Sequence, residues 1–195
     1  TIRSACEYLR SQRLENPFDD PLRRGILPPS MSAEDLGSPN QQHYWDDFWA
    51  LRGLKDAAFA ARELGYRDDA DWIEGEERAL NAALWSSINE VRRKFSISYI
   101  PNGPEEVESS AMARGTSCAL WPCDVLDTEN PLVRESFDVY WSKWIAPHKG
   151  AFEHNREFWP YAGLDLAQSY LMLGEYSRAA KMLEWTLNND PTGGF

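Results

Sequence analysis

The chain has 195 residues, of which 43% are hydrophobic, and its formal net charge is −11 at pH 7. This size allows one domain with a sizeable core. No apolar run reaches the roughly 18 residues of a membrane span, so no membrane partner is expected. The few basic residues form no block, which argues against nucleic acid or an anionic membrane as a partner.

The two ends of the sequence lead us to interpret it as a piece of a longer protein. It begins at Thr1 without a methionine and stops at Phe195 after the turn-like "DPTGG". No basic segment followed by an apolar one opens the chain, so no signal peptide is visible. The compartment therefore stays open between bacterial cytoplasm, periplasm and secretion.

Helical periodicity recurs along the chain, whereas the alternation typical of strands is nearly absent. The sequence therefore predicts an all-α protein. Asp68 or Asp69 is expected to cap the helix over 68–95. The segment "SISYIPNGP" (96–104) is the one short extended stretch expected. In chain order, we expect a helix at Ile2–Leu14, a proline-containing loop over 15–42, and helices over 44–64, 68–95, 108–119, 131–145, 158–173 and 176–189.

The three cysteines, Cys6, Cys118 and Cys123, show neither a CxxC motif nor a Cys/His metal spacing. We interpret them as small buried hydrophobic residues, with a Cys118–Cys123 disulfide as the alternative. No metal site and no cofactor are expected.

An internal repeat links the two halves of the chain. Residues 48–66, "FWALRGLKDAAFAARELGY", align with residues 158–176, "FWPYAGLDLAQSYLMLGEY", at an offset of 110 residues. The matches include Phe48 with Phe158, Trp49 with Trp159, and Gly53 with Gly163. The chain thus reads as a lone helix followed by three helical hairpins. Small residues crowd the first helices and charged residues the second, which predicts an inner and an outer layer.

The stretches "HYWDDFWALRGLKDAA" and "EHNREFWPYAGLDLAQSYLMLGEYSRAAKMLEWTLNNDP" resemble the six-hairpin glycosidase superfamily, in its general bacterial branch. The resemblance covers most of the chain from Gln41 onward, together with the leading helix. It implies one partial (α/α)6-toroid domain over 1–195, with a lone helix 2–14, a loop 15–42 and three hairpins over 44–190. It also implies a sugar-binding cleft at the N-termini of the inner helices. Because about half of the six hairpins are present, we expect the chain alone to be inactive.

Two adjacent acids stand where a core helix begins. On a helical wheel, Asp46 and Asp47 fall within the apolar arc of the helix over 44–64. Acids in a first helical turn are also favoured by the helix dipole, so capping is the plain alternative. Glycoside hydrolysis commonly needs two carboxyl groups, and adjacent helical residues diverge by about 100°. We therefore pair Asp47 with Glu157, from another hairpin, as catalytic candidates.

Polar and aromatic residues around both inner-helix starts are candidates for saccharide contacts, since aromatic rings stack on sugar rings. Asp47 is the likelier ligand contact of the two acids. Five other tryptophans are expected to pack in the core or between helices: Trp49, Trp72, Trp85, Trp141 and Trp185. The predicted substrate-binding residues are His43, Tyr44, Trp45, Asp46, Arg114, His154, Trp159 and Tyr161.

Three other functions remain open. The first is a non-catalytic saccharide binder or inactive fragment. The second is a tetratricopeptide-like scaffold, which needs a period of about 34 residues rather than 110. The third is a terpene-type synthase, whose DDxxD motif is missing. The expected partners are a carbohydrate ligand and, to cover exposed helix flanks, a second copy of the chain.

Overall fold

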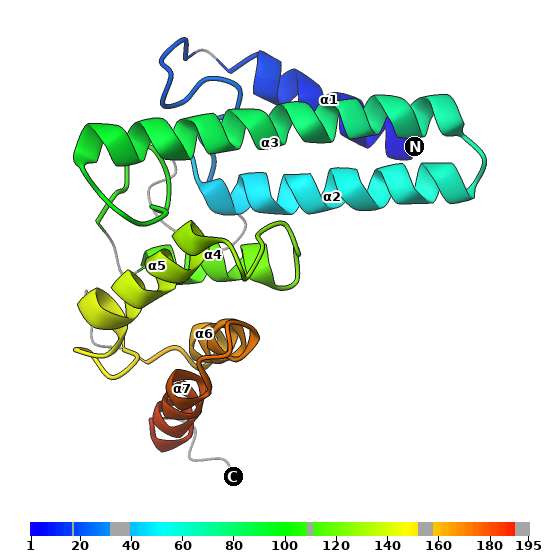
Figure 1. The fold of residues 1–195 in the computed structure, drawn as a ribbon. Coiled ribbons are helices and arrows are strands. Elements are labelled where there is room, and N and C mark those ends of the chain that lie inside the picture. Colours follow the sequence, from blue (N-terminus) through cyan, green and yellow to red (C-terminus); the bar gives the residue numbers. More distant parts are fainter. Residues whose placement is uncertain (17, 32–39, 109–110, 152–157, 190–195) are drawn as a thin grey trace. The chain divides into compact units, whose positions relative to one another are not determined.

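The computed structural model describes residues 1–16, 18–31, 40–108, 111–151 and 158–189, except for the side chains of 111–114. The described residues are all-helical and contain no strand, which confirms the all-α class (Figure 1). The elements are α1 (Ile2–Leu14), α2 (Tyr44–Glu63), α3 (Arg67–Phe95), α4 (Ala111–Leu120), α5 (Pro131–Tyr140), the π-helix η1 (Trp141–Ile145), α6 (Pro160–Met172) and α7 (Tyr176–Asn188).

The chain divides into two compact units. Unit 1 comprises Thr1–Ile97 with Gly103–Val107, and unit 2 comprises Ser98–Asn102 with Glu108–Phe195. Within the described ranges, none of the helices has both the length and the apolar character that crossing a bilayer requires.

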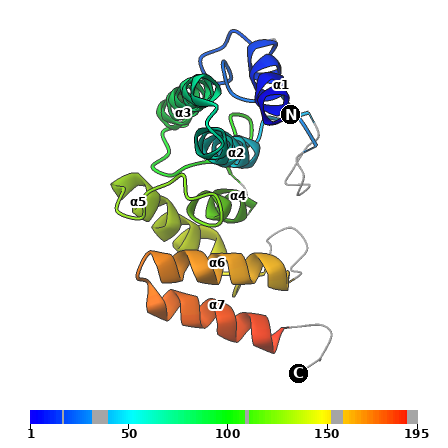
Figure 2. The ribbon, with the colours of Figure 1, turned by 90° about the vertical axis from the view of Figure 1, so that its right-hand side faces the viewer.

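Unit 1 is a long α2–α3 hairpin with α1 packed against both helices, as Figure 2 shows end-on. Leucine, isoleucine and alanine side chains fill the space between these helices. Gly65, with φ of 85°, ends α2 in the left-handed conformation that glycine adopts without a Cβ penalty. The buried residues of this core include Leu51, Leu54, Ala58, Ala70, Ile73, Leu80, Leu84 and Ile88.

Unit 2 is built from shorter helices around an aromatic core. Helix α4 packs against α5 and α6, and α6 packs against α7. The ring centroid of Phe137 lies 5.4 Å from that of Tyr140 and 5.7 Å from that of Tyr170, both edge-on. The hydroxyl of Tyr170 donates to the Phe137 carbonyl oxygen at 2.9 Å. The core is therefore held by edge-to-face rings whose polar ends are satisfied.

Several expected helix ends differ from the structure. Helix α3 begins at Arg67, and its N-cap is Tyr66, so the predicted caps at Asp68 and Asp69 are wrong. Asp69 instead accepts a hydrogen bond from Arg3 of α1 at 2.7 Å. The helix expected over 131–145 changes at Trp141 from α to π geometry. Tertiary contacts at these ends override the local signals.

The cysteine prediction is confirmed. Cys6, Cys118 and Cys123 are all buried and free. The extended character expected over 96–104 does not produce a strand in this described segment. A single antiparallel bridge instead joins Ser30 to Gln41 within unit 1.

Candidate functional site

The first turns of α2, residues 44–53 and here called the α2 head, separate the two adjacent acids into different environments. Asp47 is 0% exposed, whereas Asp46 is half-buried. The cause is the 100° step between neighbouring helical residues, which turns Asp47 toward the core and Asp46 toward its edge. The acids therefore cannot perform the same task.

The buried Asp47 carboxylate binds the backbone of the loop that precedes α2. Its Oδ1 accepts the backbone N–H of Leu27 at 2.9 Å, while its Oδ2 is buried without a hydrogen-bond partner among the described residues. Burial raises the pKa of Asp47 well above its usual range, and the neighbouring Asp46 acts in the same direction. The Leu27 amide and the positive charge of Arg13 only partly oppose this rise in pKa.

Asp46 contacts the same loop nearer to the surface. Its Oδ2 accepts a hydrogen bond from the Ser30 hydroxyl at 2.6 Å. The Ser30 backbone N–H donates to the Gln41 carbonyl oxygen at 3.1 Å. The Asp46 carboxylate is thus fixed beside the start of α2 and remains partly open to solvent.

His43 and Tyr44 lie inside unit 1 rather than at a surface. The Tyr44 hydroxyl is 2.8 Å from the Ser87 hydroxyl, which in turn donates to the Leu22 carbonyl oxygen. Burial raises the pKa of Tyr44. The Tyr44 hydroxyl is therefore hydrogen-bonded inside the core. That Tyr44 and His43 contact a ligand stays a prediction, and the burial of both residues does not favour it.

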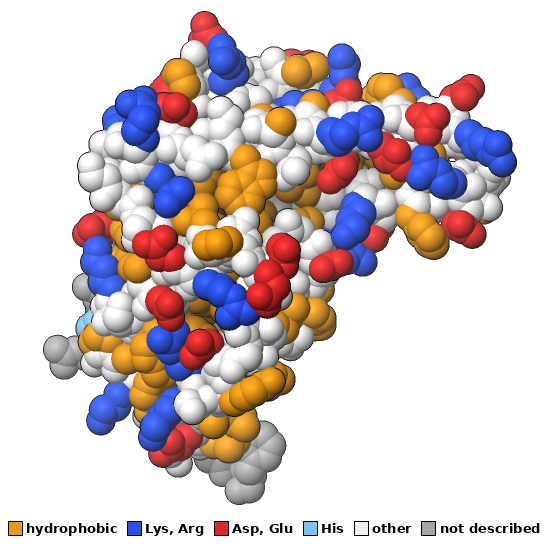
Figure 3. All heavy atoms as spheres, in the orientation of Figure 1, with side chains coloured by type: hydrophobic (Ala, Val, Ile, Leu, Met, Phe, Trp, Pro, Cys, Tyr) orange, Lys and Arg blue, Asp and Glu red, His pale blue; other side chains and the backbone are white. Residues whose placement is uncertain are grey.

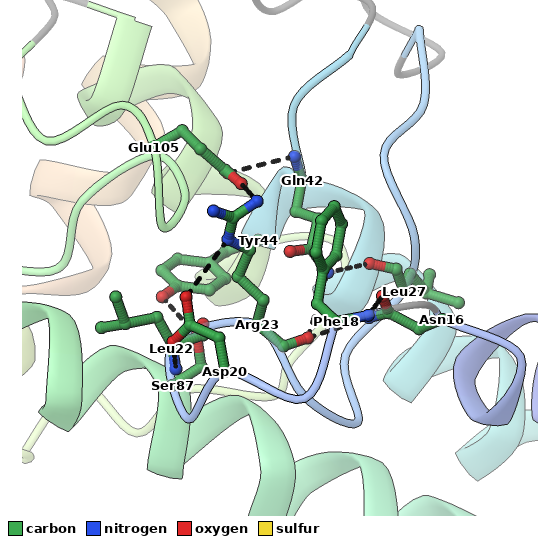
Figure 4. A network of polar contacts seen from close by, with 10 residues as sticks. All are labelled: Asn16, Phe18, Asp20, Leu22, Arg23, Leu27, Gln42, Tyr44, Ser87 and Glu105. Carbon is green, nitrogen blue, oxygen red and sulfur yellow. Dashed lines mark hydrogen bonds and ion pairs between the residues drawn. The ribbon is translucent and has the colours of Figure 1, made fainter.

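A polar network holds the loop against the α2 head (Figure 4). Gln42 donates through Nε2 to the carbonyl oxygens of Leu27 at 2.7 Å and Arg23 at 3.2 Å. The Arg23 guanidinium lies 3.2 Å from the Glu105 carboxylate and 4.3 Å from the centre of the Phe18 ring. A Cβ at Gly103 would overlap the Gln42 carbonyl oxygen, so glycine is required for this close approach.

The sequence interpretation missed Arg23 and Gln42 as organisers of this region. The usable signal was the cluster "DDPLRRG" in an otherwise proline-containing loop. A loop of this length in a compact domain is commonly functional, so charged residues within it are worth considering as contacts. Arg23 and Gln42 share the partner Glu105, which lies 82 and 63 residues further along the chain, respectively.

The aromatic surface of the α2 head consists of Trp45 and Trp49. Their ring centroids are 5.6 Å apart and their planes are tilted by 52°. Trp49 is 40% exposed, so it does not lie in the core, and the alternative that it packs between helices stays a prediction. Trp49 follows Asp46 by three residues, which places both side chains on neighbouring positions of one helical face. An indole pair and a carboxylate therefore border the same surface.

A second exposed aromatic pair occurs at the start of α6 in unit 2. The ring centroids of Trp159 and Tyr161 are 5.8 Å apart, with a 48° tilt, and both side chains are exposed. The predicted site residues Glu157 and His154 lie outside the described residues, as does the side chain of Arg114. The catalytic pairing of Asp47 with Glu157 stays a prediction.

Among the residues that the structure describes, no three His, Cys, Asp or Glu side chains come together as a group that could hold a metal ion.

No protein-family model, curated protein or solved structure matches the chain. The chemistry of the α2 head therefore rests on its own geometry. That geometry offers a tilted indole pair, a half-buried carboxylate and a fixed loop, while the second acid is sealed inside the core.

Proposed function

We propose that the chain is a saccharide-binding, glycoside hydrolase-like helical-hairpin protein, and that it binds sugar rings on the aromatic surface of the α2 head. The observation that carries this proposal is the Trp45–Trp49 pair, of which Trp49 is exposed and Trp45 half-buried, on the helix that also carries the half-buried Asp46 carboxylate. The resemblance of "HYWDDFW" to six-hairpin glycosidases supports the same ligand class. An (α/α)6-toroid arrangement belongs to this proposal as well.

The chemistry of the surface suits a neutral sugar. Indole rings offer an apolar face to the C–H groups of a sugar ring, and a carboxylate oxygen accepts its hydroxyl protons. The tilt of 52° between the two rings gives a bent platform rather than a flat one. Polar groups placed beside apolar surface are what orient a small ligand in a binding site.

Binding is favoured over hydrolysis because Asp47, the catalytic candidate among the described residues, is sealed away from any ligand. Two carboxyl groups about 5–9.5 Å apart must flank the scissile bond in most glycosidases. Asp47 has the raised pKa of a general acid, but it is completely buried and bonded to Leu27. A catalytic role for Asp47 would require the Leu27 segment to move away.

The test is a saccharide screen on the chain, followed by titration of the best ligand against variants. Trp49→Ala is expected to weaken binding about 10-fold through the loss of ring stacking. Asp46→Asn is expected to weaken it by a smaller factor, because the amide keeps one acceptor oxygen. Isothermal titration calorimetry measures both effects.

Phe59→Ala is the matched control, since Phe59 is an exposed aromatic residue of the same helix, outside the α2 head. It is expected to leave affinity unchanged. Absence of any saccharide ligand, or equal affinity for wild type and Trp49→Ala, would contradict the proposal. Glycoside hydrolysis that Asp47→Asn abolishes while the fold is retained would replace binding by catalysis as the function.

A further inference from the structure

Asp47 is the one acidic residue that is buried among the residues the structure describes. Other acidic side chains reach the surface, where Figure 3 shows them interspersed with basic ones. Burial takes the water away from a carboxylate, so a buried acid without a paired cation commonly keeps its proton instead. The groups around Asp47 decide which of the two forms it takes.

The side chains of Asp47 and Gln42 hold Leu27 from two directions. Asp47 Oδ1 accepts the Leu27 N–H at 2.9 Å, and Gln42 Nε2 donates to the Leu27 carbonyl oxygen at 2.7 Å (Figure 4). Gln42 Nε2 also donates to the Arg23 carbonyl oxygen at 3.2 Å. Because both of its partners are carbonyl oxygens, the orientation of the Gln42 amide is fixed, and Oε1 can only accept.

The second oxygen of each of these side chains lacks a donor. Gln42 Oε1 and Asp47 Oδ2 are both buried, and neither has a hydrogen-bond partner among the described residues. Buried polar atoms are nearly always hydrogen-bonded. Two acceptors cannot bond each other, whereas a protonated carboxyl group donates one hydrogen bond. A single proton on Asp47 Oδ2 therefore satisfies both oxygens at once.

The charges around Asp47 favour the proton as well. The titratable and charged groups on the elements packed around it are Asp46 and Tyr44 of α2, Arg13 of α1, Glu76 of α3, and Arg23 and Glu105 beside Gln42. Each of the two arginines is already paired with a glutamate, Arg13 at 2.8 Å and Arg23 at 3.2 Å. The charge of Asp46 therefore adds to the effect of burial, and together they raise the pKa of Asp47 well above its usual range.

We propose that Asp47 carries a proton that it donates to Gln42 Oε1, and that this shared proton latches the Leu27 segment to the start of α2. When the proton leaves to solvent, two unprotonated oxygens repel each other and the carboxylate needs water. We expect the loop to loosen so that water enters. Ser30, three residues beyond Leu27, then loses its fixed place against Asp46. The latch acts whichever ligand the α2 head binds, and it makes the loop sensitive to pH.

The test is a carboxyl-carbon NMR titration of the full chain with labelled aspartate. Asp47 is expected to titrate well above the ordinary pKa of about 3.9. Gln42→Met keeps a side chain of similar length but removes the acceptor oxygen, so it is expected to weaken proton binding by Asp47 about 3- to 10-fold. Gln41→Met is the matched control, since Gln41 contacts Ser30 through its backbone and should leave the pKa of Asp47 unchanged.

Hydrogen exchange of the Leu27 amide tests the latch itself and does not depend on the Gln42→Met variant folding. In wild type, the protection factor of this amide is expected to fall at least about 10-fold as Asp47 ionises. Asp47→Asn should keep the protection over the same pH range, because the introduced amide donates toward Gln42 while its oxygen still accepts from Leu27.

Three results would overturn the proposal. The first is an Asp47 that titrates at its ordinary pKa, which would mean that another donor satisfies the two oxygens. The second is an equal pKa of Asp47 in wild type and Gln42→Met. The third is a Leu27 amide whose protection in wild type does not change as Asp47 ionises.

Discussion

The α2 head and the start of α6 share their sequence pattern but not their geometry. Trp49 lies within α2, whereas its match Trp159 is the extended N-cap of α6, with φ of −111° and ψ of 100°. The difference traces to one position, because Ala50 is matched by Pro160. Proline excludes the helical conformation from the residue before it and suits the first helical position. Repeated aromatic residues therefore sit on a helical face in one copy and before a helix in the other.

The matched glycines teach the same lesson about packing. Gly53 faces open space, with no atom within 4 Å of a Cβ built on it. Gly163 is buried, and its Cβ would lie 2.8 Å from the Thr186 Oγ1 and 3.3 Å from the Phe158 ring. Only the second glycine allows the close helix approach that small residues were expected to provide. Identity of residue type does not imply identity of role.

The largest loss of stability is expected when the proline of the α6 copy is introduced at the matching position of α2. Ala50→Pro would place proline in the interior of α2, where it removes a backbone hydrogen bond and clashes with the preceding turn. We expect a loss of about 3 kcal/mol or more in the free energy of unfolding. Denaturant unfolding followed by circular dichroism measures it.

The reciprocal change, Pro160→Ala, is the control for that measurement. It removes only a residue that fits the first position of α6, so the expected change is below about 1 kcal/mol. Equal losses in the two variants would show that the proline does not explain where the two helices begin.

An intermediate effect is expected at the glycines. Gly163→Ala should lower the free energy of unfolding by about 1–3 kcal/mol, since the new methyl group overlaps Thr186. Gly53→Ala should raise it by about 0.5–1 kcal/mol, because alanine favours an exposed helix interior. Thermal unfolding compares the two variants directly.

Relief of the overlap provides the check on this explanation. Combining Gly163→Ala with Thr186→Ala removes the Oγ1 atom, and the double variant should regain part of the lost stability relative to Thr186→Ala alone. If Gly163→Ala does not lower the free energy of unfolding relative to Gly53→Ala, the close contact of α6 with α7 at Gly163 is contradicted.

The smallest effect is expected at neutral pH from Asp47→Asn. Asp47 has a folded-state pKa above its unfolded value of about 3.9, so the folded state holds more protons between those two values. The stability that Asp47 contributes is present below pH 4 and falls as pH rises through this window. Asp47→Asn should match wild type near pH 4 and exceed it in unfolding free energy at pH 7.

Asp46→Asn, at the adjacent half-buried position, should reduce the pH slope without abolishing it, because it removes a neighbouring charge that raises the pKa of Asp47. A wild-type unfolding free energy with the same pH slope as Asp47→Asn would contradict a raised pKa of the buried Asp47. Urea unfolding at several pH values gives the required slopes.

Much of the helical framework could be predicted from sequence because it depends on local properties. The bounds of α1 agree with the expected Ile2–Leu14, and α2 begins at the expected Tyr44. The ends that were missed depend on distant partners. Asp69 lies inside the first turn of α3, and its carboxylate pairs with Arg3, which is 66 residues away.

The candidate site could be located on α2 but not resolved atom by atom. The helical wheel placed both Asp46 and Asp47 in the apolar arc, yet the structure buries Asp47 and leaves Asp46 half-buried. Trp49 was assigned to the core or to packing between helices, and the structure leaves it 40% exposed. An arc on a wheel covers more than 100°, so it cannot distinguish the centre of a buried face from its edge.

The sequence by itself determined the all-α class, the periodic helices and the proline that starts α6, because periodicity and proline geometry act within a few residues. Tertiary structure alone decided which acid is sealed in the core, which glycine is packed and which tryptophan is exposed. Each of those outcomes depends on a contact between distant segments, such as Leu27 with Asp47 or Gly163 with Thr186. Local sequence rules do not encode such contacts.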